Sequence, residues 1–453
     1  MRVLQVIHQF PPYSSQGSEV YCDHLSRCLR EAGDDVRVFH VSNTDRRRPR
    51  RLERLTLDGL PTYHCIDGAE YARVAAWPNG FLRRQFQAVL DEFKPQVSHF
   101  HNYLSLGDDL VTLARAAGAV LYTLHDYGLM CPNSLLLRSD GQLCGKASSD
   151  FFQDCCPELI RTAHHLPAAL MTQIPPLARW RRYADQQTRP GLRRVMRSGV
   201  RIAESLLGQP AVTDVAVKRE FFLARTRQIF RDANLFLAPS EFLRQRYISS
   251  GVPADRIVYL PNGMPHFARV DRTPGGHRVR FGYIGALHAH KGIDLLLQAF
   301  EGLHEQAELH IHGSAFGSPI SQSYWRRIQD AHGARVTFHG AYDNRNIGAV
   351  LSSLDVVVVP SLWYENSPLT IQEAFIAGVP VITADQGGMA ELVRHDVNGL
   401  LFRLGDREHL RAALRRVADE PALLERLRRN IPDVPDIARQ AGLVRTYYEG
   451  VLS

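Results

Sequence analysis

Short apolar runs alternate with amphipathic stretches along the first 270 residues. The run Val3–Ile7 predicts a buried strand, and the stretch after the following loop predicts a helix that Gly33 ends. The apolar positions of that helix recur on one face, at Tyr21, Leu25, Cys28, Leu29 and Ala32. Further strands are predicted at Val36–Val41, Val97–Phe100, Val120–Leu124, Leu235–Ala238 and Ile257–Leu260. This rhythm is typical of a parallel sheet with crossover helices.

The same rhythm begins again at Arg280. Its predicted strands are Phe281–Ile284, Leu309–Ile311, Val336–Phe338, Asp355–Val359 and Val381–Thr383. Between the two halves, residues 271–277 (DRTPGGH) have the composition of an interdomain linker. A chain of 453 residues is also too long for one hydrophobic core. We therefore expect an α/β protein with two Rossmann-like, doubly wound parallel-sheet domains.

The predicted domains occupy residues 1–270 and 278–430, and residues 431–453 form a C-terminal helix. The alternation of strand and helix patterns is interrupted between about residues 131 and 231. We interpret this segment as an insertion in the first domain that is rich in cysteine and arginine. The net charge of +7 is concentrated there, since residues 158–232 hold 14 Lys and Arg against 6 Asp and Glu.

The basic segment 179–207 has three readings: a solvated helical face, a nucleic-acid patch or a membrane-docking segment. Apolar residues alternate with its arginines, which favours docking on an anionic membrane surface. No recognised nucleic-acid module is present, so we expect no nucleic-acid partner.

The number of cysteines and the hydropathy of the sequence indicate the cellular compartment of the protein. Seven cysteines are an odd number, which favours reduced thiols over a disulfide framework. No run reaches the 18 apolar residues of a membrane-spanning helix, and the N-terminus resembles a strand rather than a signal peptide. We expect a cytoplasmic protein, peripheral at the inner face of the membrane.

Four of the cysteines cluster near two histidines and offer a zinc hypothesis. The residues concerned are Cys131, Cys144, Cys155, Cys156, His164 and His165. Because their spacing lacks paired C-x-x-C knuckles, we predict thiols without metal.

Two loops after predicted strands of the second half carry chemistry. The loop from Gly285 to Gly292 opens a helix and has Lys291 at its mouth, which suits phosphate. In the loop after the fourth strand, Ser367 and Pro368 predict the N-cap and first position of a helix over 368–377, closed by Gly378. Taken singly, such features are ordinary surface and capping residues.

Together these elements resemble the signature of family 4 glycosyltransferases, retaining enzymes of the GT-B fold. The central motif is Glu365, seven residues and Glu373, ahead of Gly378. Supporting matches are the Gly17 loop, His125-Asp126, Pro261-Asn262-Gly263, the Gly285 to Lys291 loop and Gly387 to Glu391. The resemblance implies two domains that face a central cleft, with the C-terminal helix packing back across it.

The resemblance also implies roles for single residues. The residues assigned to the donor nucleotide sugar are Gly17, Gly285, Lys291, Glu365, Asn366, Ser367 and Glu373. Glu373 would bind the ribose hydroxyls, whereas Glu365 and the amides after it would hold the sugar. Lys291 would stabilise the diphosphate, and Gly17 would bring its amide to the distal phosphate. His125 would lie at the reacting centre, so the catalytic set is His125, Lys291 and Glu365.

Three further polar residues follow a predicted strand, and two bulky ones precede the signature glutamate. We predict acceptor contacts for His99, His101 and Asn102, against a structural role for a polar strand end. Trp363 and Tyr364 either shape the sugar pocket or pack.

The chain departs from its relatives at two positions. Many relatives have arginine where this chain has Ala286, so His288 or His290 replaces that cation or Lys291 acts alone. Relatives also often have two glycines at the first loop, where Gln16 here precedes Gly17.

The function that follows is retaining transfer from a UDP- or GDP-sugar to a saccharide or lipid-linked acceptor, in surface polysaccharide or glycan synthesis, without metal or cofactor. One alternative is another GT-B activity, such as an epimerase or a phosphorylase, against which the two glutamates argue. The other is a non-catalytic scaffold, which Ala286 makes worth weighing.

Overall fold

The structure is a computed structural model of the chain. It describes residues 1–14, 16–42, 50–67, 80–101, 106, 109–131, 134–138, 141–145, 215–267, 278–303, 307–314 and 335–453. The predicted linker 271–277 and most of the predicted insertion lie outside these ranges.

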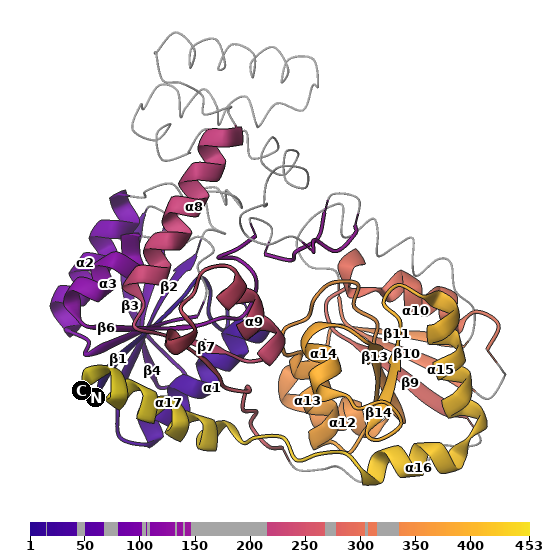
Figure 1. Ribbon diagram of the computed structural model, residues 1–453. Coiled ribbons are helices and arrows are strands. Elements are labelled where there is room, and N and C mark those ends of the chain that lie inside the picture. Colours follow the sequence, from indigo (N-terminus) through magenta and orange to yellow (C-terminus); the bar gives the residue numbers. More distant parts are fainter. Residues whose placement is uncertain are drawn as a thin grey trace, which may run out of the picture.

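The first sheet lies in the N-terminal half and has eight strands in the described part of the chain (Figure 1). Its order is β3-β4-β2-β1-β5-β6-β7-β8, and only the β3/β4 pair is antiparallel. The strands are β1 (Arg2–Ile7), β2 (Asp35–Ser42), β3 (Arg51–Leu57), β4 (Leu60–Ile66), β5 (Val97–Phe100), β6 (Ala119–Thr123), β7 (Leu235–Ala238) and β8 (Ile257–Tyr259). The hairpin of β3 and β4 was not predicted, because charged residues alternate through its outer strand.

Helices cover both faces of the first sheet. They are α1 (Gly17–Glu31), α2 (Gly80–Phe93), α3 (Asp109–Ala117), α8 (Val215–Asp232), α9 (Glu241–Ser249) and α17 (Ile437–Leu452). Apolar side chains of α2, α3 and α9 pack on one face, and those of α1 and α17 on the other. Helix α8 begins inside residues 131–231 and ends at Asp232, so regular structure resumes earlier than the sequence pattern predicted.

The second sheet is fully parallel in the described part of the chain, with the order β11-β10-β9-β12-β13-β14. Its strands are β9 (Val279–Ile284), β10 (Ala307–His312), β11 (Val336–Gly340), β12 (Val356–Val359), β13 (Val381–Ala384) and β14 (Gly399–Phe402). The helices with it are α10 (Ile293–Phe300), α12 (Ile347–Ser352), α13 (Leu369–Ile376), α14 (Gly387–Leu392), α15 (Arg407–Asp419) and α16 (Pro421–Arg429). Strand β14 was missed by the sequence analysis.

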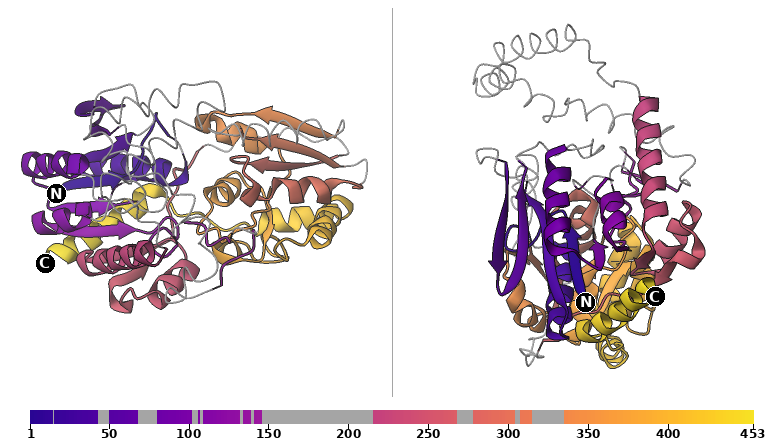
Figure 2. Two further views of the ribbon diagram at one scale, coloured as in Figure 1. Left: turned by 90° about the horizontal axis from the view of Figure 1, so that it is seen from above. Right: turned by 90° about the vertical axis from the view of Figure 1, so that its left-hand side faces the viewer.

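The last helix returns to the first sheet. After α16 the chain runs back beneath both domains, and α17 lies against α1 and β6 (Figures 1 and 2). Val444 and Tyr448 of α17 are fully buried there. The first domain is therefore completed by residues from the far end of the sequence.

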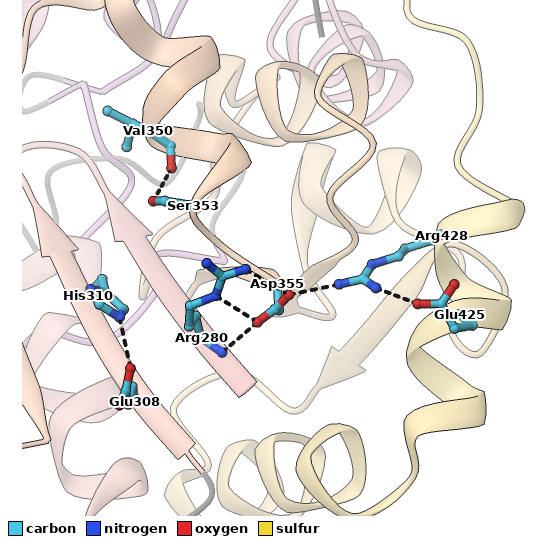
Figure 3. A network of polar contacts seen from close by, with 8 residues as sticks. All are labelled: Arg280, Glu308, His310, Val350, Ser353, Asp355, Glu425 and Arg428. Atoms are coloured by element: carbon cyan, nitrogen blue, oxygen red, sulfur yellow. Dashed lines mark hydrogen bonds and ion pairs between the residues drawn. The ribbon is translucent and has the colours of Figure 1, made fainter. Parts of the chain in front are cut away.

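A charged network ties the second sheet to α16 at the amino ends of its strands (Figure 3). Asp355, just before β12, accepts hydrogen bonds from the backbone and Nε of Arg280 in β9, at 2.9 and 3.1 Å. Its other oxygen accepts from Nη2 of Arg428 at 3.0 Å, and Arg428 also pairs with Glu425. Because ligands bind beyond the carboxyl ends of such sheets, this network is structural.

A hydrogen-bonded asparagine joins the two domains. The Oγ of Ser240, the N-cap of α9, donates to Oδ1 of Asn366 at 2.7 Å, and Nδ2 of Asn366 donates to the carbonyl oxygen of Leu124 at 3.0 Å. Asn366 is buried, so both ends of its amide are satisfied by the first domain. The loop after β12 is thereby held against the ends of β6 and β7.

A second contact joins α14 to α9. The backbone N–H groups of Glu241 and Phe242, the first residues of α9, donate to the carboxylate of Glu391 at 2.9 and 2.5 Å. A carboxylate at a helix N-terminus is favoured by the helix dipole. Beside it, the rings of Phe242 and Tyr364 stack with their centroids 5.1 Å apart, under the guanidinium of Arg246.

Replacing Asp355 by asparagine should lower the free energy of unfolding by about 2–3 kcal/mol, because two arginines would lose their shared carboxylate in a largely buried place. Urea denaturation measures this loss. The control Glu425→Gln removes an exposed partner of Arg428 and should cost under about 1 kcal/mol. Equal effects of the two variants would contradict a central role for Asp355.

The variant Asn366→Ala should open the contact between the domains. It leaves the Leu124 carbonyl without its partner and costs about 1–3 kcal/mol. Small-angle X-ray scattering should then give a larger radius of gyration than for the parent protein. The control Asn430→Ala, at the exposed C-cap residue of α16, should leave the radius of gyration unchanged. An unchanged radius of gyration for Asn366→Ala would show that other contacts hold the domains.

Candidate active site

The candidate site lies where loops at the carboxyl ends of β1, β6, β9 and β12 come together. Gly17, the first residue of α1, lies against Leu369, the first residue of α13: a Cβ on Gly17 would stand 3.6 Å from Cδ1 of Leu369. Two helix N-termini from different domains therefore meet here. Backbone N–H groups at helix starts and the positive ends of helix dipoles favour an anion.

Lys291 and Glu365 form an ion pair in this site. Lys291 ends the 3₁₀ turn η3 (Ala289–Lys291) after β9, and its Nζ donates to Oε1 of Glu365 at 2.7 Å. The ammonium also lies 5.2 Å from the ring centroid of Trp363. Lys291 keeps about a third of its side-chain surface exposed, whereas Glu365 is buried. The ion pair brings together the two loops singled out from the sequence.

The surroundings of Glu365 keep it ionised. Burial alone would raise its pKa, but the Lys291 ammonium and hydrogen bonds from Ser361 Oγ (2.7 Å) and Trp363 Nε1 (2.8 Å) outweigh burial and lower it. All three described donors reach Oε1. The second oxygen has no bond to the described residues, so it can accept from a ligand hydroxyl.

Glu373 has the opposite electrostatics. It lies inside α13 and is 7% exposed, and no described residue donates a hydrogen bond to its carboxyl group. Burial raises its pKa to about 7. Tyr342 lies nearby, and its own pKa is raised by burial and by this carboxylate. A carboxyl group buried without a partner costs stability unless a ligand supplies hydrogen-bond donors.

The start of α13 differs from the prediction. Ser367 was predicted as N-cap, but Pro368 occupies that position with extended backbone (φ −61°, ψ 117°), and the helix runs from Leu369 to Ile376. Ser367 instead accepts a hydrogen bond from Nε2 of Gln372 at 3.0 Å. The side chain of Asn366 is hydrogen-bonded to the first domain. Its backbone amide therefore remains for the predicted contact with the nucleotide sugar.

The glycine-rich loop after β9 is held tightly against the signature loop. A Cβ on Gly292, which has φ +75°, would lie 1.9 Å from the carbonyl oxygen of Pro360, so only glycine fits. The N–H of Leu362 donates to the carbonyl oxygen of His290 at 2.8 Å. Gly285 is in the same loop with φ +148°.

The position of Ala286 holds no cation. Its carbonyl oxygen accepts a hydrogen bond from the hydroxyl of Tyr283 at 2.8 Å. The rings of His288 and His290 stack with centroids 5.4 Å apart, and His290 meets the edge of Trp363. Lys291 remains the cation that this loop brings to Glu365.

His125 lies at the end of β6 and is partly exposed. Its Nε2 is 3.1 Å from Nδ1 of His101, and the ring of Tyr21 meets it edge-on at 5.2 Å. Burial and the neighbouring His8 lower the pKa of His125 to about 3, so it is neutral.

His99 and His101, for which acceptor contacts were predicted, lie in the packed interior of the first domain. Both are 0% exposed, and both ring nitrogens of each have protein partners. The side chains of alternate residues of β5 point into the packed layer between the sheet and α17. The sequence around β5 did not reveal this layer, because it shows only polar residues at the end of a strand. Asn102 lies outside the described residues.

The site includes residues that the sequence analysis missed. Ser361 donates a hydrogen bond to Glu365, and Ser240 fixes Asn366 from the first domain. Trp363 and Tyr364, named from the sequence, are buried and pack edge-on against Tyr127 of the first domain, and Trp363 also donates to Glu365. Ser361 stands four positions before Glu365, but nothing in the pattern marked it.

Several predictions fall on residues that are not described. Cys155, Cys156, His164, His165 and the basic segment 179–207 all lie there, whereas Cys131 and Cys144 are buried in the first domain. Among the described residues, no three His, Cys, Asp or Glu side chains gather as metal ligands would. In the same ranges, every helix is too short or too polar to cross a bilayer.

Comparisons with known proteins give the family. The model for glycosyl transferases group 1 matches residues 270–434, and the model for the glycosyl transferase 4-like domain matches residues 16–263. The D-inositol 3-phosphate glycosyltransferase of Xylanimonas cellulosilytica is 35% identical over 121 residues, 26% of this chain and 29% of that protein. The GDP-mannose-dependent alpha-mannosyltransferase of Mycobacterium tuberculosis is 29% identical over 191 residues, 40% of this chain and 47% of that protein. The chain thus spans less than half the length of these curated relatives.

A solved structure shows the same fold over nearly the whole chain. The Anabaena protein HepE, in complex with UDP-glucose, has a TM-score of 0.62 and 15% identity, covering 99% of this chain and 100% of that one. From the two family models and this fold we conclude that the chain belongs to the group 1, family 4 glycosyltransferases and has the GT-B fold.

Proposed function

We propose that this chain is a retaining glycosyltransferase that moves a sugar from a UDP- or GDP-sugar to a saccharide or lipid-linked acceptor. The observation that carries the proposal is the combination of an ionised Glu365, paired with Lys291, and a buried Glu373 eight positions later that has no hydrogen-bond donor among the described residues. Protein side chains hold the carboxylate of Glu365 in place. Glu373 has no described hydrogen-bond donor, and the hydroxyl groups of a nucleotide sugar can supply the donors.

The diphosphate of the donor would lie between the starts of α1 and α13, next to Lys291. Loss of the sugar leaves an additional negative charge on the phosphate oxygens. Lys291 and the backbone N–H groups of both helix starts stabilise that charge without rearrangement. We propose that Gly17 and Gly285 also contact the diphosphate through their backbone. We further propose that catalysis needs no metal.

The ribose and the sugar would each use one glutamate. Two vicinal ribose hydroxyls can donate to the two oxygens of Glu373, which would satisfy the buried carboxylate. Sugar hydroxyls would donate to the second oxygen of Glu365, with the backbone amides of Asn366 and Ser367 beside it.

Retention follows if the acceptor attacks from the face that the phosphate leaves. The departing phosphate oxygen then takes the acceptor proton, so the protein supplies no nucleophile and Glu365, tied to Lys291, Ser361 and Trp363, stays in place. His125, neutral and partly exposed at the end of β6, would contact the sugar near the reacting carbon.

The choice of nucleotide stays between uridine and guanosine. One relative is named for GDP-mannose, and the Anabaena structure holds UDP-glucose. A role in surface polysaccharide or glycan synthesis follows from the family resemblance. Docking of segment 179–207 on an anionic membrane in the cytoplasm remains a prediction from the sequence.

A panel of UDP-, GDP- and ADP-sugars tests the proposal directly. The cognate donor should raise the melting temperature in a concentration-dependent way and be slowly hydrolysed without acceptor. Lys291→Ala should lower this turnover by about 10²-fold to 10³-fold. The control Arg407→Ala removes a half-exposed cation on α15 and should leave turnover unchanged. A protein that binds no donor of the panel and hydrolyses none would be the scaffold instead.

Glu373→Gln should remove a pH-dependent cost to stability. In the folded protein the carboxyl group keeps its proton up to about pH 7, whereas in the unfolded chain it loses it near 4.5, so the wild type loses stability as pH rises through this range. Without donor, the variant should exceed the wild type by about 2–3 kcal/mol at pH 8 and match it near pH 4.5. Urea denaturation at both pH values measures the difference.

Donor binding provides the second half of that test. The donor-induced rise in melting temperature should be strongly reduced in Glu373→Gln, since an amide has one accepting oxygen where the carboxylate offers two, and its NH₂ group faces a hydroxyl as a second donor. Glu425→Gln, at an exposed glutamate of α16, is the matched control and should change neither stability profile nor donor binding. Parallel pH profiles of wild type and Glu373→Gln would contradict an unpartnered buried carboxylate.

A further inference from the structure

A chain of five buried hydrogen bonds runs from His125 to the C-terminal helix and back to β6. Nε2 of His125 is 3.1 Å from Nδ1 of His101, and Nε2 of His101 is 2.6 Å from Oε1 of Gln5. Nε2 of Gln5 donates to the hydroxyl of Tyr448 at 3.3 Å. That hydroxyl is 2.7 Å from Nδ1 of His99, whose Nε2 is 2.7 Å from Oγ1 of Thr123. All members except His125 are buried.

The amide of Gln5 gives the chain a direction. Its oxygen can only accept, so Nε2 of His101 carries the proton and donates. A neutral imidazole with a proton on Nε2 has an acceptor at Nδ1, and therefore Nε2 of His125 must donate to it. His125 in turn has its proton on Nε2, which leaves a lone pair on Nδ1.

The other end of the chain runs in the same direction. The amide nitrogen of Gln5 donates to the hydroxyl of Tyr448, and the one other described partner of that hydroxyl is Nδ1 of His99, so the hydroxyl proton goes to Nδ1. His99 then donates from Nε2 to Thr123. Five bonds that all point one way polarise one another, which strengthens each of them.

The histidines are uncharged, as this arrangement requires. Burial, followed by the neighbouring histidines, holds the pKa of His99 at about 3 and that of His101 well below its ordinary value. A charged imidazole would carry protons on both nitrogens and so would break the sequence of donors and acceptors.

We propose that Tyr448, through Gln5 and His101, fixes His125 as the tautomer that presents an unprotonated Nδ1 to the donor sugar. Tyr448, Gln5, His99 and His101 are thus positioning residues that lie beneath the site. No described residue bonds Nδ1 of His125, and the residue is partly exposed. Because Nδ1 of His125 can only accept a hydrogen bond, it favours a donor sugar that has a hydroxyl group facing this nitrogen. This inference rests on the proposed function of the site.

The tautomer can be measured directly in the full-length protein. In ¹⁵N-histidine-labelled protein, long-range ¹H–¹⁵N correlation spectra distinguish a protonated from an unprotonated ring nitrogen, and His125→Asn assigns the signals. We expect Nε2 protonated and Nδ1 unprotonated at neutral pH. A proton on Nδ1 of His125, or a mixture of tautomers, would overturn the proposal.

Tyr448→Phe removes the hydroxyl in the middle of the chain and keeps the ring. The expected result is a mixture of His125 tautomers and a roughly fivefold to tenfold lower kcat, the effect of about one hydrogen bond, with the KM of the donor unchanged. The control Tyr447→Phe removes a hydroxyl from the neighbouring, partly buried tyrosine of α17, which has no described hydrogen bond, and should change neither. An unaltered His125 spectrum in Tyr448→Phe would refute the link, even where activity falls.

The spectra and the donor panel separate two kinds of failure. If no nucleotide sugar binds but His125 shows the expected tautomer in the wild type and loses it in Tyr448→Phe, the hydrogen-bond chain stands and the proposed function fails. If donors bind and turn over while the spectra of wild type and variant agree, the proposed function stands and the inference fails.

Discussion

The candidate site exists because one loop of the second domain is held by the first. Residues 363–366 leave the second sheet after β12, and their side chains are buried among residues of the first domain: Trp363 and Tyr364 against Tyr127, and Asn366 between Ser240 and the Leu124 carbonyl. Glu365 lies in the same loop but turns back to Lys291. The contact between the domains and the placement of the carboxylate therefore depend on the same loop.

Of the two signature glutamates, Glu365 lies on the loop before α13 and Glu373 lies inside that helix. They differ in the hydrogen-bond donors that the protein provides. Glu365 has three donors and stays charged, whereas Glu373 has none in the described structure and holds its proton up to about pH 7. A protein selected for stability alone would not keep the second one. The unpaired carboxyl group is understandable as a site whose donors arrive with a ligand.

Features that depend on nearby residues could be predicted from the sequence. Most strands of both sheets, though not β3, β4 or β14, follow from short apolar runs, and Lys291, Glu365 and Glu373 stand in loops and a helix that local spacing identifies. Features that depend on distant residues could not. The bond between Gln5 and Tyr448 joins positions 443 apart, and the burial of His99 and His101 depends on the same helix. The polar end of β5 therefore looked like a binding surface although α17 covers it. The start of α13 shifted by one residue for a local reason, since Pro368 takes an extended backbone before the first turn.

The returning helix α17 has a consequence for how the protein is made. One face of the first sheet packs Tyr21, Leu25 and Leu29 of α1 against Ile437, Val444 and Tyr448 of α17. During synthesis the first domain leaves the ribosome early, but this apolar layer stays uncovered until some two hundred further residues have been added. The nascent chain consequently exposes a hydrophobic surface while its second domain is translated, and the domain made first is the last to be completed.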